Sequence, residues 1–242
     1  GLYSRYYFLY AVDLHIDYCT DLNKKFVIIL ININEFKDIN DYLGIGVGDK
    51  MLNEFSKRLT DIKKDNNIIS RINADEFSIL CKSDDIIEIE NLASEVLDII
   101  RVPFLINNSV IHINGRVGIS MYPYDGKDVE TLMRSADIAL CKAKEIHGRK
   151  ICFFSREMYE ETKDNFLYAN YLTNSISNNE LSIHYQPIFN LKDCTEIVGL
   201  EALLRWTNAT LGNVPPAVFI PLAEKSGQIV SIGEWLEKIL NL

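Results

Sequence analysis

An uninterrupted apolar run at Phe26–Ile31, FVIILI, decides much of the architecture of this chain. Its β-branched residues favour a strand, and the lack of polar alternation indicates that both faces of this strand are buried. A strand covered on both faces belongs to a sheet that has helices packed on it. The run ends at Asn32-Ile33-Asn34, where the sequence turns polar. Ligands of sheets flanked by helices usually bind at such strand ends.

Two further apolar runs, Ile68–Ile72 and Phe77–Cys81, enclose a short polar segment. Both runs have the length of buried strands, so the segment between them is predicted to be a hairpin turn. Asn73 suits such a turn because asparagine adopts positive φ at low cost. Asp75 and Glu76 follow, and on a strand they point to opposite faces. On these residues alone an exposed acidic turn is the better interpretation, so the case for a site depends on the rest of the chain.

Helical periodicity recurs around these strands. Apolar residues at helical spacing predict helices within residues 1–25, 35–43, 49–62, 88–100 and 129–146, and short apolar runs predict strands at 110–113, 116–121 and 151–154. Asp49 is predicted to be an N-cap. Alternating strands and helices indicate an α/β or α+β protein with helices packed on a sheet.

The pattern restarts in the last third of the chain. A long polar helix is predicted over 155–179, followed by strands at 181–186 and 197–206 and helices at 215–225 and 229–242. We place a boundary within residues 159–172. The expected organisation is a first domain at 1–158, a connector helix at 159–180 and a second segment at 181–242.

Composition excludes several classes of protein. With 242 residues, 48% hydrophobic and 24% charged, the chain is typical of soluble globular proteins. Its formal net charge of -9 argues against nucleic-acid binding, although a single nucleotide could still bind in a pocket. Five cysteines without a CxxC pair indicate free thiols in a reducing cytoplasm. No apolar run reaches the length of a membrane span, and there is no signal peptide.

Several motifs in the same order resemble the GGDEF domain of diguanylate cyclases, over nearly all of residues 1–154. In chain order, Gly1–Arg5 resembles the end of LTGLxNR, Asn32–Asp41 resembles DxDxFKxxND, Gly44–Asp49 resembles GHxxGD, Asn73-Ala74-Asp75-Glu76-Phe77 stands at the GGDEF signature, and Ala136–Lys144 resembles ADxALYxAK. This resemblance implies an α+β, nucleotidyl-cyclase-like fold with a mostly antiparallel central sheet flanked by helices.

The last segment resembles the start of an EAL domain, a cyclic di-GMP phosphodiesterase. Tyr185–Pro187 matches YQP, Glu201–Trp206 matches EALLRW, and Pro216–Glu224 matches PxxFIPxAE. The match covers about 70 residues of a barrel that needs about 250, so a partial β/α-barrel segment is expected. Such a segment exposes apolar surface. We expect this surface to pack against the first domain, against a second chain, or against the rest of a longer chain.

The resemblance also implies roles for individual residues of the first domain. A cyclase binds Mg²⁺ (or Mn²⁺) through the positions of Asn32 and Asp75. Magnesium prefers anionic oxygen ligands, and Asn32 offers only a neutral amide oxygen, so one of two carboxylates is missing. The side chains of Asn73 and Ala74 crowd the phosphates where the family has glycines. Lys144 would contact phosphate, and Arg149 is one residue out of the family's register.

Guanine recognition is better preserved. Asn40 and Asp49 match the residues with which the family reads guanine, and their side chains suit its hydrogen-bonding edge. An interhelix turn for Asn40 and a helix cap for Asp49 are the alternatives. The family's product-inhibition motif, RxxD, is absent, since Lys64 and Asn67 stand at its positions.

In the EAL part, the resemblance makes Glu201 a Mg²⁺ or Mn²⁺ ligand at the carboxyl end of a barrel strand. Arg205 would contact a phosphate of cyclic di-GMP and Gln186 would line its pocket. A buried Glu–Arg pair is the alternative. The remaining metal ligands and the general base are expected on strands that this chain lacks.

We therefore expect a cyclic di-GMP signalling protein. Its GGDEF domain is cyclase-inactive, binds GTP and regulates an EAL phosphodiesterase that is truncated in this chain. Two alternatives stay open, a weakly active diguanylate cyclase that converts two GTP to cyclic di-GMP and a nucleotide-free dimerisation or docking scaffold. A homodimer, an upstream sensor domain and a cytoplasmic location are also expected, with a membrane tether outside this chain left open.

Overall fold

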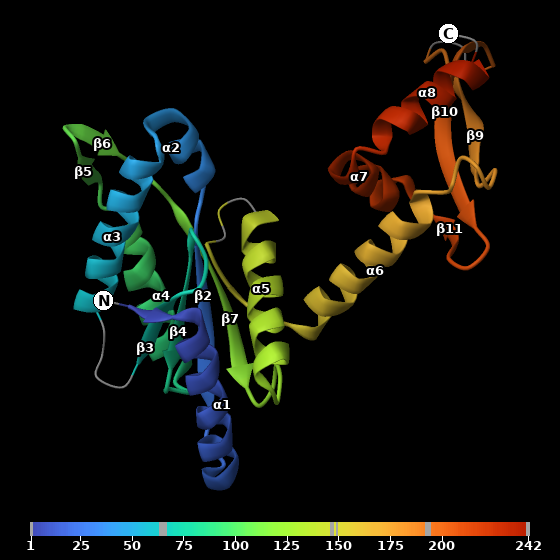
Figure 1. Ribbon diagram of the computed structural model, residues 1–242. Helices are drawn as coiled ribbons and strands as arrows, with labels where there is room; N and C mark the ends of the chain where they lie inside the picture. The colour runs from blue at the N-terminus through green and yellow to red at the C-terminus, as the bar shows by residue number, and fades with distance from the viewer. Residues whose placement is uncertain (1, 63–66, 146–147, 149, 192–194, 241–242) are drawn as a thin grey trace. The chain divides into compact units, whose positions relative to one another are not determined.

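Strand β2 (Phe26–Ile33) lies inside a six-stranded sheet, and every one of its residues is buried. Strands β4 (Glu76–Cys81) and β7 (Gly115–Tyr122) pair with it antiparallel on either side. The strand order is β1–β3–β4–β2–β7–β8, in which the outer strands are β1 (Tyr3–Ser4), β3 (Ile68–Arg71) and β8 (Ile151–Phe153). The β1–β3 and β7–β8 pairs are parallel, and the other pairs of this sheet are antiparallel. The predicted mostly antiparallel sheet is therefore confirmed (Figure 1).

This structure is a computed structural model that describes residues 2–62, 67–145, 148, 150–191 and 195–240. The chain divides into two units, Gly1–Tyr159 and Glu160–Leu242. Each unit has its own buried apolar cluster, so each is held together by its own side chains.

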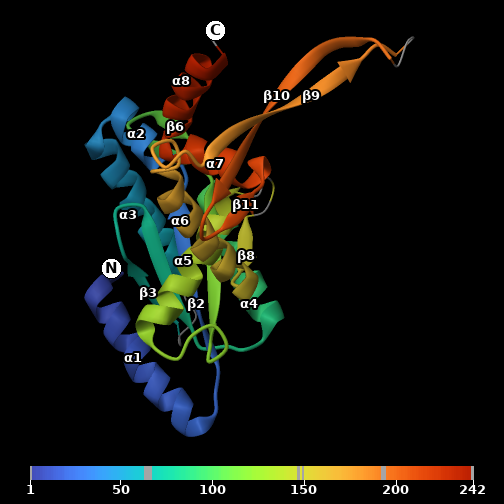
Figure 2. The same ribbon diagram turned by 90° about the vertical axis from the view of Figure 1, so that its right-hand side faces the viewer.

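Helices cover both faces of the six-stranded sheet (Figures 1 and 2). On one face, α1 (Arg5–Leu22) and α5 (Val129–Glu145) pack on Ile28 and Leu30 of β2. On the other, α3 (Ile45–Asp61) and α4 (Ile86–Arg101) pack on Ile29 and Ile31. Successive residues of β2 thus enter opposite cores, which explains why the run carries no polar residue. The short helix α2 (Phe36–Leu43) follows β2 directly, and β5 (Phe104–Ile106) and β6 (Ser109–Ile111) form a separate hairpin.

Gly118 sets the spacing between α5 and the sheet. A Cβ built on Gly118 of β7 would lie 2.2 Å from the carbonyl oxygen of Ala136 and 2.3 Å from the backbone nitrogen of Leu140. No side chain fits there, so the α5 backbone rests directly on β7.

Two boundaries differ from the sequence-based expectation. Helix α3 begins at Ile45 with Gly44 at its N-cap, so Asp49 lies inside the helix and is not its cap. The glycines at 46 and 48 are accommodated within α3 because the surrounding packing outweighs their poor helix propensity. The polar helix predicted over 155–179 is α6 (Arg156–Leu172), which ends earlier. Turns follow it up to Asn179, which adopts a left-handed φ of 55°; the asparagines of this stretch favour such turns.

The second unit contains a three-stranded antiparallel sheet with two helices. Its strands are β9 (Leu181–Phe189), β10 (Ile197–Asn208) and β11 (Gly212–Val214), and its helices are α7 (Pro216–Ser226) and α8 (Ile229–Leu240). Its core gathers around Trp206, which makes edge contacts with the rings of Tyr168 and Phe219.

Strands β9 and β10 form a long antiparallel ribbon (Figure 2). Several apolar side chains on it are exposed. Those exposed by about half or more include Tyr185, Ile188, Ile197, Val198 and Leu200. The exposed apolar surface expected of a partial barrel is present within this unit. What covers it stays a prediction.

Two further expectations concern cysteines and membranes. Cys19 and Cys141 are free thiols. Over the described ranges, the helices are too short or too polar to cross a bilayer.

Candidate functional site

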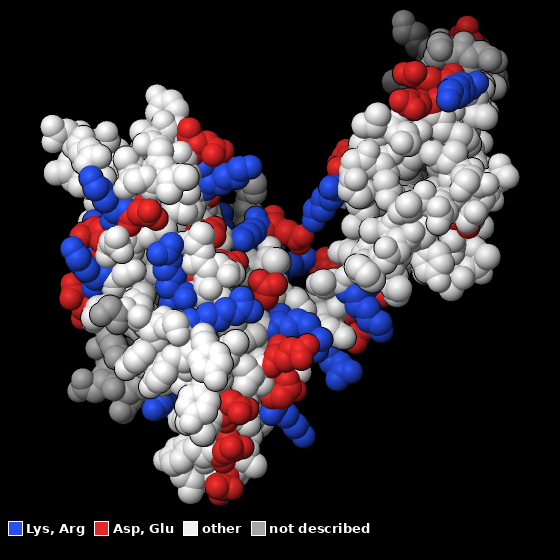
Figure 3. Space-filling model, in the orientation of Figure 1, with Lys and Arg blue, Asp and Glu red and all other residues white. Residues whose placement is uncertain are grey.

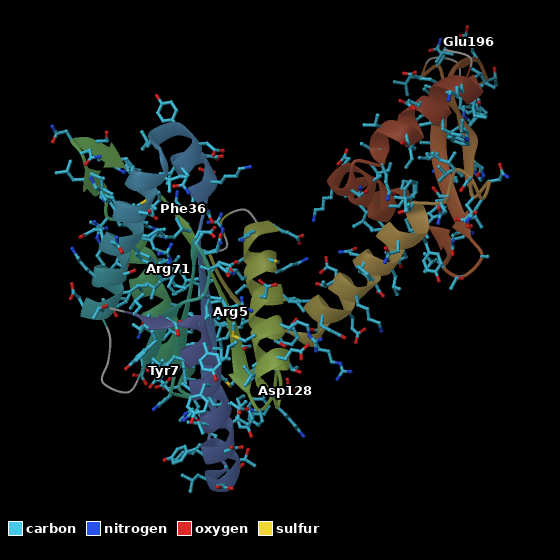
Figure 4. The ribbon with its side chains drawn as sticks, in the orientation of Figure 1. Arg5, Tyr7, Phe36, Arg71, Asp128 and Glu196 are labelled. Atoms are coloured by element: carbon cyan, nitrogen blue, oxygen red, sulfur yellow. The ribbon has the colours of Figure 1, made fainter. Side chains whose placement is uncertain are left out.

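The hairpin between β3 and β4 is closed by its own side chains. The backbone nitrogens of Ile72 and Asn73 donate to the carbonyl of Glu76, over 2.8 and 3.3 Å. The guanidinium of Arg71, labelled in Figure 4, donates to the carbonyls of Asn73 and Ala74. The expected positive φ at Asn73 is wrong, since this residue is not among the described non-glycine residues with positive φ. Its amide instead donates to the Glu76 carboxylate over 2.5 Å, and this bond and Arg71 hold the turn.

Asn32 and Asp75 bond directly to each other. Nδ2 of Asn32 donates to Oδ2 of Asp75 over 3.0 Å, and the Asn32 side chain is buried, at 6% exposure. The backbone nitrogen of Ile33 also donates to the Asp75 carbonyl, over 3.0 Å. Asp75, the one carboxylate at the two positions where a metal was expected, therefore has a neutral amide as its partner.

The strand register puts three polar side chains on the face that α5 covers. Asn32 of β2 stands opposite Glu76 of β4 and opposite Arg116 of β7. Directly opposed residues share a face of the sheet. The Arg116 Nε donates to the carbonyl of Ala143 in α5 over 3.0 Å. Arg116 was not predicted to be a site residue, although a charged residue within a predicted strand could have indicated one.

The neighbouring surface of α5 is electrostatically mixed. Burial raises the pKa of Asp137, and the Glu76 carboxylate raises it further, whereas Lys144 opposes the shift. Burial also raises the pKa of the Cys141 thiol, and the negative charge of Asp137 adds to this. The side chain of Lys144 is exposed, on the last turn of α5. Glu76, Asp137 and Lys144 thus influence one another across the end of the sheet.

These residues do not fit a magnesium site. Within the described residues there is no group of three or more His, Cys, Asp or Glu side chains that could hold a metal ion. Asp75 already accepts a hydrogen bond from Asn32, and the positive charge of Arg116 on the adjacent strand disfavours a cation there. The Mg²⁺ or Mn²⁺ expected from Asn32 and Asp75 therefore lacks an adequate donor set.

Asn40 and Asp49 lie on the consecutive helices α2 and α3. Oδ1 of Asn40 is buried without a hydrogen-bond partner among the described residues. It lies 2.0 Å from the position that a Cβ on Gly48 would take, so only glycine at 48 leaves room for it. Asp49 is exposed and, being inside α3, is available for other contacts. A buried carbonyl oxygen without a donor is costly unless a ligand or water supplies one.

Two other residues singled out from the sequence, Phe77 and Asn67, are buried. Phe77 is fully buried and packs edge-on against Phe55, with ring centroids 4.8 Å apart. Asn67 is buried at 6% exposure. Lys64 and Arg149 lie outside the described residues.

In the second unit, Gln186 and Glu201 stand directly opposite each other on β9 and β10. Arg205 lies four residues further along β10, on the same face, and donates to the carbonyl of Leu204 over 2.9 Å. Glu201 is exposed in the middle of β10, so its expected place at the carboxyl end of a strand is wrong. The reason is that β10 extends to Asn208 through its pairing with β11.

Comparison with known proteins accounts for both units. The model of the GGDEF family, described as diguanylate cyclase, GGDEF domain, matches residues 1–150, and the EAL domain model matches residues 169–240. The first unit is also similar to the active GGEEF domain of a diguanylate cyclase from Vibrio cholerae. That similarity has a TM-score of 0.58 and 26% identity, and covers 64% of this chain and 99% of that one.

Two relatives resemble nearly the whole chain. It is 30% identical to the cyclic di-GMP phosphodiesterase NbdA of Pseudomonas aeruginosa, over 98% of this chain and 30% of that protein. It is 32% identical to the bifunctional diguanylate cyclase/cyclic di-GMP phosphodiesterase MucR of the same organism, over 88% of this chain and 31% of that protein. The chain thus spans about a third of the length of these relatives. It belongs to the GGDEF family and carries a partial EAL region after its GGDEF domain.

Proposed function

We propose that this chain is part of a cyclic di-GMP signalling protein, in which a cyclase-inactive GGDEF domain binds GTP and regulates an EAL phosphodiesterase. One contrast carries the proposal. The metal side of the site is closed by the Asn32–Asp75 hydrogen bond, whereas the buried Asn40 oxygen on the guanine side has no described partner. This arrangement favours a nucleotide base without assembling the charge that phosphoryl transfer needs.

The loss of cyclase activity follows from charge. Two metal-bridged triphosphates carry a large negative charge, which a cyclase offsets with divalent cations. In this domain Asn32 contributes no charge and its amide N–H occupies Asp75. Asn73 and Ala74 add side chains where phosphate must approach the backbone.

The guanine side supports binding of the base. The Asn40 oxygen needs a donor, and the guanine edge offers N–H groups. The exposed carboxylate of Asp49 on the next helix is a second acceptor for such donors. Lys144 is the group we assign to the phosphates.

We divide the chain by function as residues 1–158, a connector at 159–180 and an EAL segment at 181–242. Gln186, Glu201 and Arg205 on one face of the β9–β10 ribbon are the part of the cyclic di-GMP site that this chain contributes. The relatives named a phosphodiesterase and a bifunctional cyclase/phosphodiesterase support this class of function. Free thiols and the use of GTP fit a cytoplasmic location.

Calorimetric titration of the whole chain with GTP, with and without Mg²⁺, tests the proposal. We expect binding that depends little on Mg²⁺ and is lost in Asn40→Ala and Asp49→Ala. Asp75→Ala is the matched control and should retain it. Absence of binding at high micromolar GTP would refute the proposal that the domain senses GTP. The nucleotide-free docking scaffold would then be the remaining alternative.

Incubation with GTP, followed by analysis for cyclic di-GMP, distinguishes an inactive domain from a weakly active diguanylate cyclase. We expect no product from this chain. Product that disappears in Asp75→Ala would establish a weak cyclase. The triple variant Asn32→Asp, Asn73→Gly, Ala74→Gly restores the family pattern and serves as the comparison for both experiments.

A further inference from the structure

Helix α1 carries a stripe of exposed aromatic and apolar side chains that neither core uses. The exposed fractions of four members, Tyr6, Tyr10, Leu14 and Tyr18, are 83%, 54%, 51% and 48%. The full set, here called the α1 stripe, consists of Tyr3 of β1, just before the helix, and Tyr6, Tyr7, Tyr10, Leu14, Tyr18 and Leu22 of α1. The other side of α1 buries Phe8, Val12, Ile16 and Cys19. Contiguous exposed apolar surface of this kind marks an interaction site.

The spacing of the stripe suits a second helix. Tyr3, Tyr7, Tyr10, Leu14 and Tyr18 follow one another at intervals of three or four residues. This is the spacing of a seam between two helices that run side by side. The rings of Tyr3 and Tyr7 stack, with centroids 4.2 Å apart, so the N-terminal end of the stripe presents an aromatic surface. Tyr7 is labelled in Figure 4.

One flank of the stripe is acidic. Asp13, Asp17 and Asp21 recur every fourth residue and are all exposed. With 3.6 residues per turn they follow the same side of α1. Figure 3 shows acidic side chains in a row beside the white surface of this helix.

The other flank is basic. His15, Tyr18, Cys19, Lys24, Lys25 and Lys82 line a hollow of about 430 Å³. Lys24 lies over the Tyr18 ring, 5.4 Å from its centroid, and its Nζ donates to the Tyr18 hydroxyl over 3.3 Å. Three lysines converge here in a protein whose formal net charge is -9. Lys25 already lies 3.9 Å from the Asp84 carboxylate, so the hollow accepts carboxylate groups, and Lys24 and Lys82 stand beside it.

We propose that the α1 stripe is the interface of a parallel homodimer, in which the α1 helices of two copies of this chain pair about a two-fold axis along them. In this arrangement the acidic flank of each copy meets the basic hollow of the other, twice over. In an antiparallel pair the acidic flanks of both copies lie on the same side of the interface, and so do the basic flanks. Charge complementarity thus selects a second copy, in parallel, as the occupant.

Sedimentation velocity on the whole chain tests the stripe. We expect a concentration-dependent dimer that becomes monomeric in the double variant Tyr10→Glu, Leu14→Glu, with an unchanged far-UV circular dichroism spectrum. Two controls place glutamate on apolar residues elsewhere, Leu105→Glu on β5 and Leu200→Glu on β10, which are 75% and 61% exposed. Both controls should remain dimeric. A chain that is monomeric at every concentration, or a dimer lost only in Leu200→Glu, overturns the proposal.

Charge reversal tests whether the acidic flank of one copy contacts the basic hollow of the other. Asp17→Lys and Lys82→Glu should each weaken the dimer by about tenfold or more, and combining them should restore it, because opposite charges again face each other. Failure of the combined variant to recover refutes the parallel pairing.

Cysteine cross-linking tests the direction. In a parallel pair, Tyr7→Cys and Leu14→Cys each bring the new thiol opposite its own copy, so both variants should cross-link. In an antiparallel pair, at most one of these two positions lies opposite itself, so at most one of the variants should cross-link. The unsubstituted chain is the control, because Cys141 is exposed.

Discussion

Replacing Asn32 by aspartate tests whether the metal side of the site is closed by a neutral amide. The substitution removes the N–H that donates to Asp75 over 3.0 Å and puts a second carboxylate in its place. A hydrogen bond to a charged group contributes about 1.5–3 kcal/mol. Two like charges 4 Å apart repel by about 4 kcal/mol at an effective dielectric constant near 20. Asp75 is half-buried, so solvent screens part of this repulsion.

We take about 3 kcal/mol as the net loss of stability at neutral pH without divalent ions. For a domain of this size that corresponds to a fall in Tm of roughly 10 °C. Mg²⁺ or Mn²⁺ should reverse most of the fall, because two carboxylates form a binding site for a divalent cation. The unsubstituted chain should show no such response.

Differential scanning calorimetry with EDTA or with Mg²⁺ measures the effect. Trp206 and Trp235, the two tryptophans of the sequence, both lie in the second unit. Their fluorescence therefore gives an internal control whose transition should not move. Asn32→Ala is the matched variant, since it loses the hydrogen bond without adding charge and should gain nothing from Mg²⁺. An equal Mg²⁺ response in the unsubstituted chain would refute the reasoning.

Three further substitutions probe other contacts. Gly118→Ala drives a methyl group to 2.2 Å from the Ala136 carbonyl, so we expect a loss of about 1–3 kcal/mol or more in chemical denaturation. Burial, Lys82 and Lys24 lower the pKa of His15. Since the unfolded chain then binds more protons, stability should fall as pH drops below about 6.5 and through the folded-state pKa, and His15→Gln should flatten this slope in Tm measured against pH. Glu180→Ala removes the acceptor of the Trp206 indole N–H, 3.0 Å away, and should shift the tryptophan emission; an unchanged spectrum would contradict this contact.

Much of the fold was predictable from sequence because burial leaves a clear pattern. The run at Phe26–Ile31 predicted a strand buried on both faces, and β2 is such a strand. The hairpin between β3 and β4 was located correctly for the same reason. Asp49 was misplaced because Gly44, Gly46 and Gly48 resemble a helix break, whereas packing extends α3 through two of them.

The candidate site was predictable only in part. Motif order identified Asn32 and Asp75, yet no local pattern reveals that these side chains, 43 residues apart, bond to each other. Arg116 was missed because its importance depends on strand register, which sets it opposite Asn32. The unpartnered oxygen of Asn40 depends on its contact with Gly48 and is likewise a tertiary property.

The bond from the Ile33 nitrogen to the Asp75 carbonyl has a consequence for amide hydrogen exchange. Together with the Asn32 side chain, it ties the turn to the end of β2 at two points. Exchange at Ile33 then requires opening of the sheet rather than movement of a loop, so its protection should match that of the interior of β2.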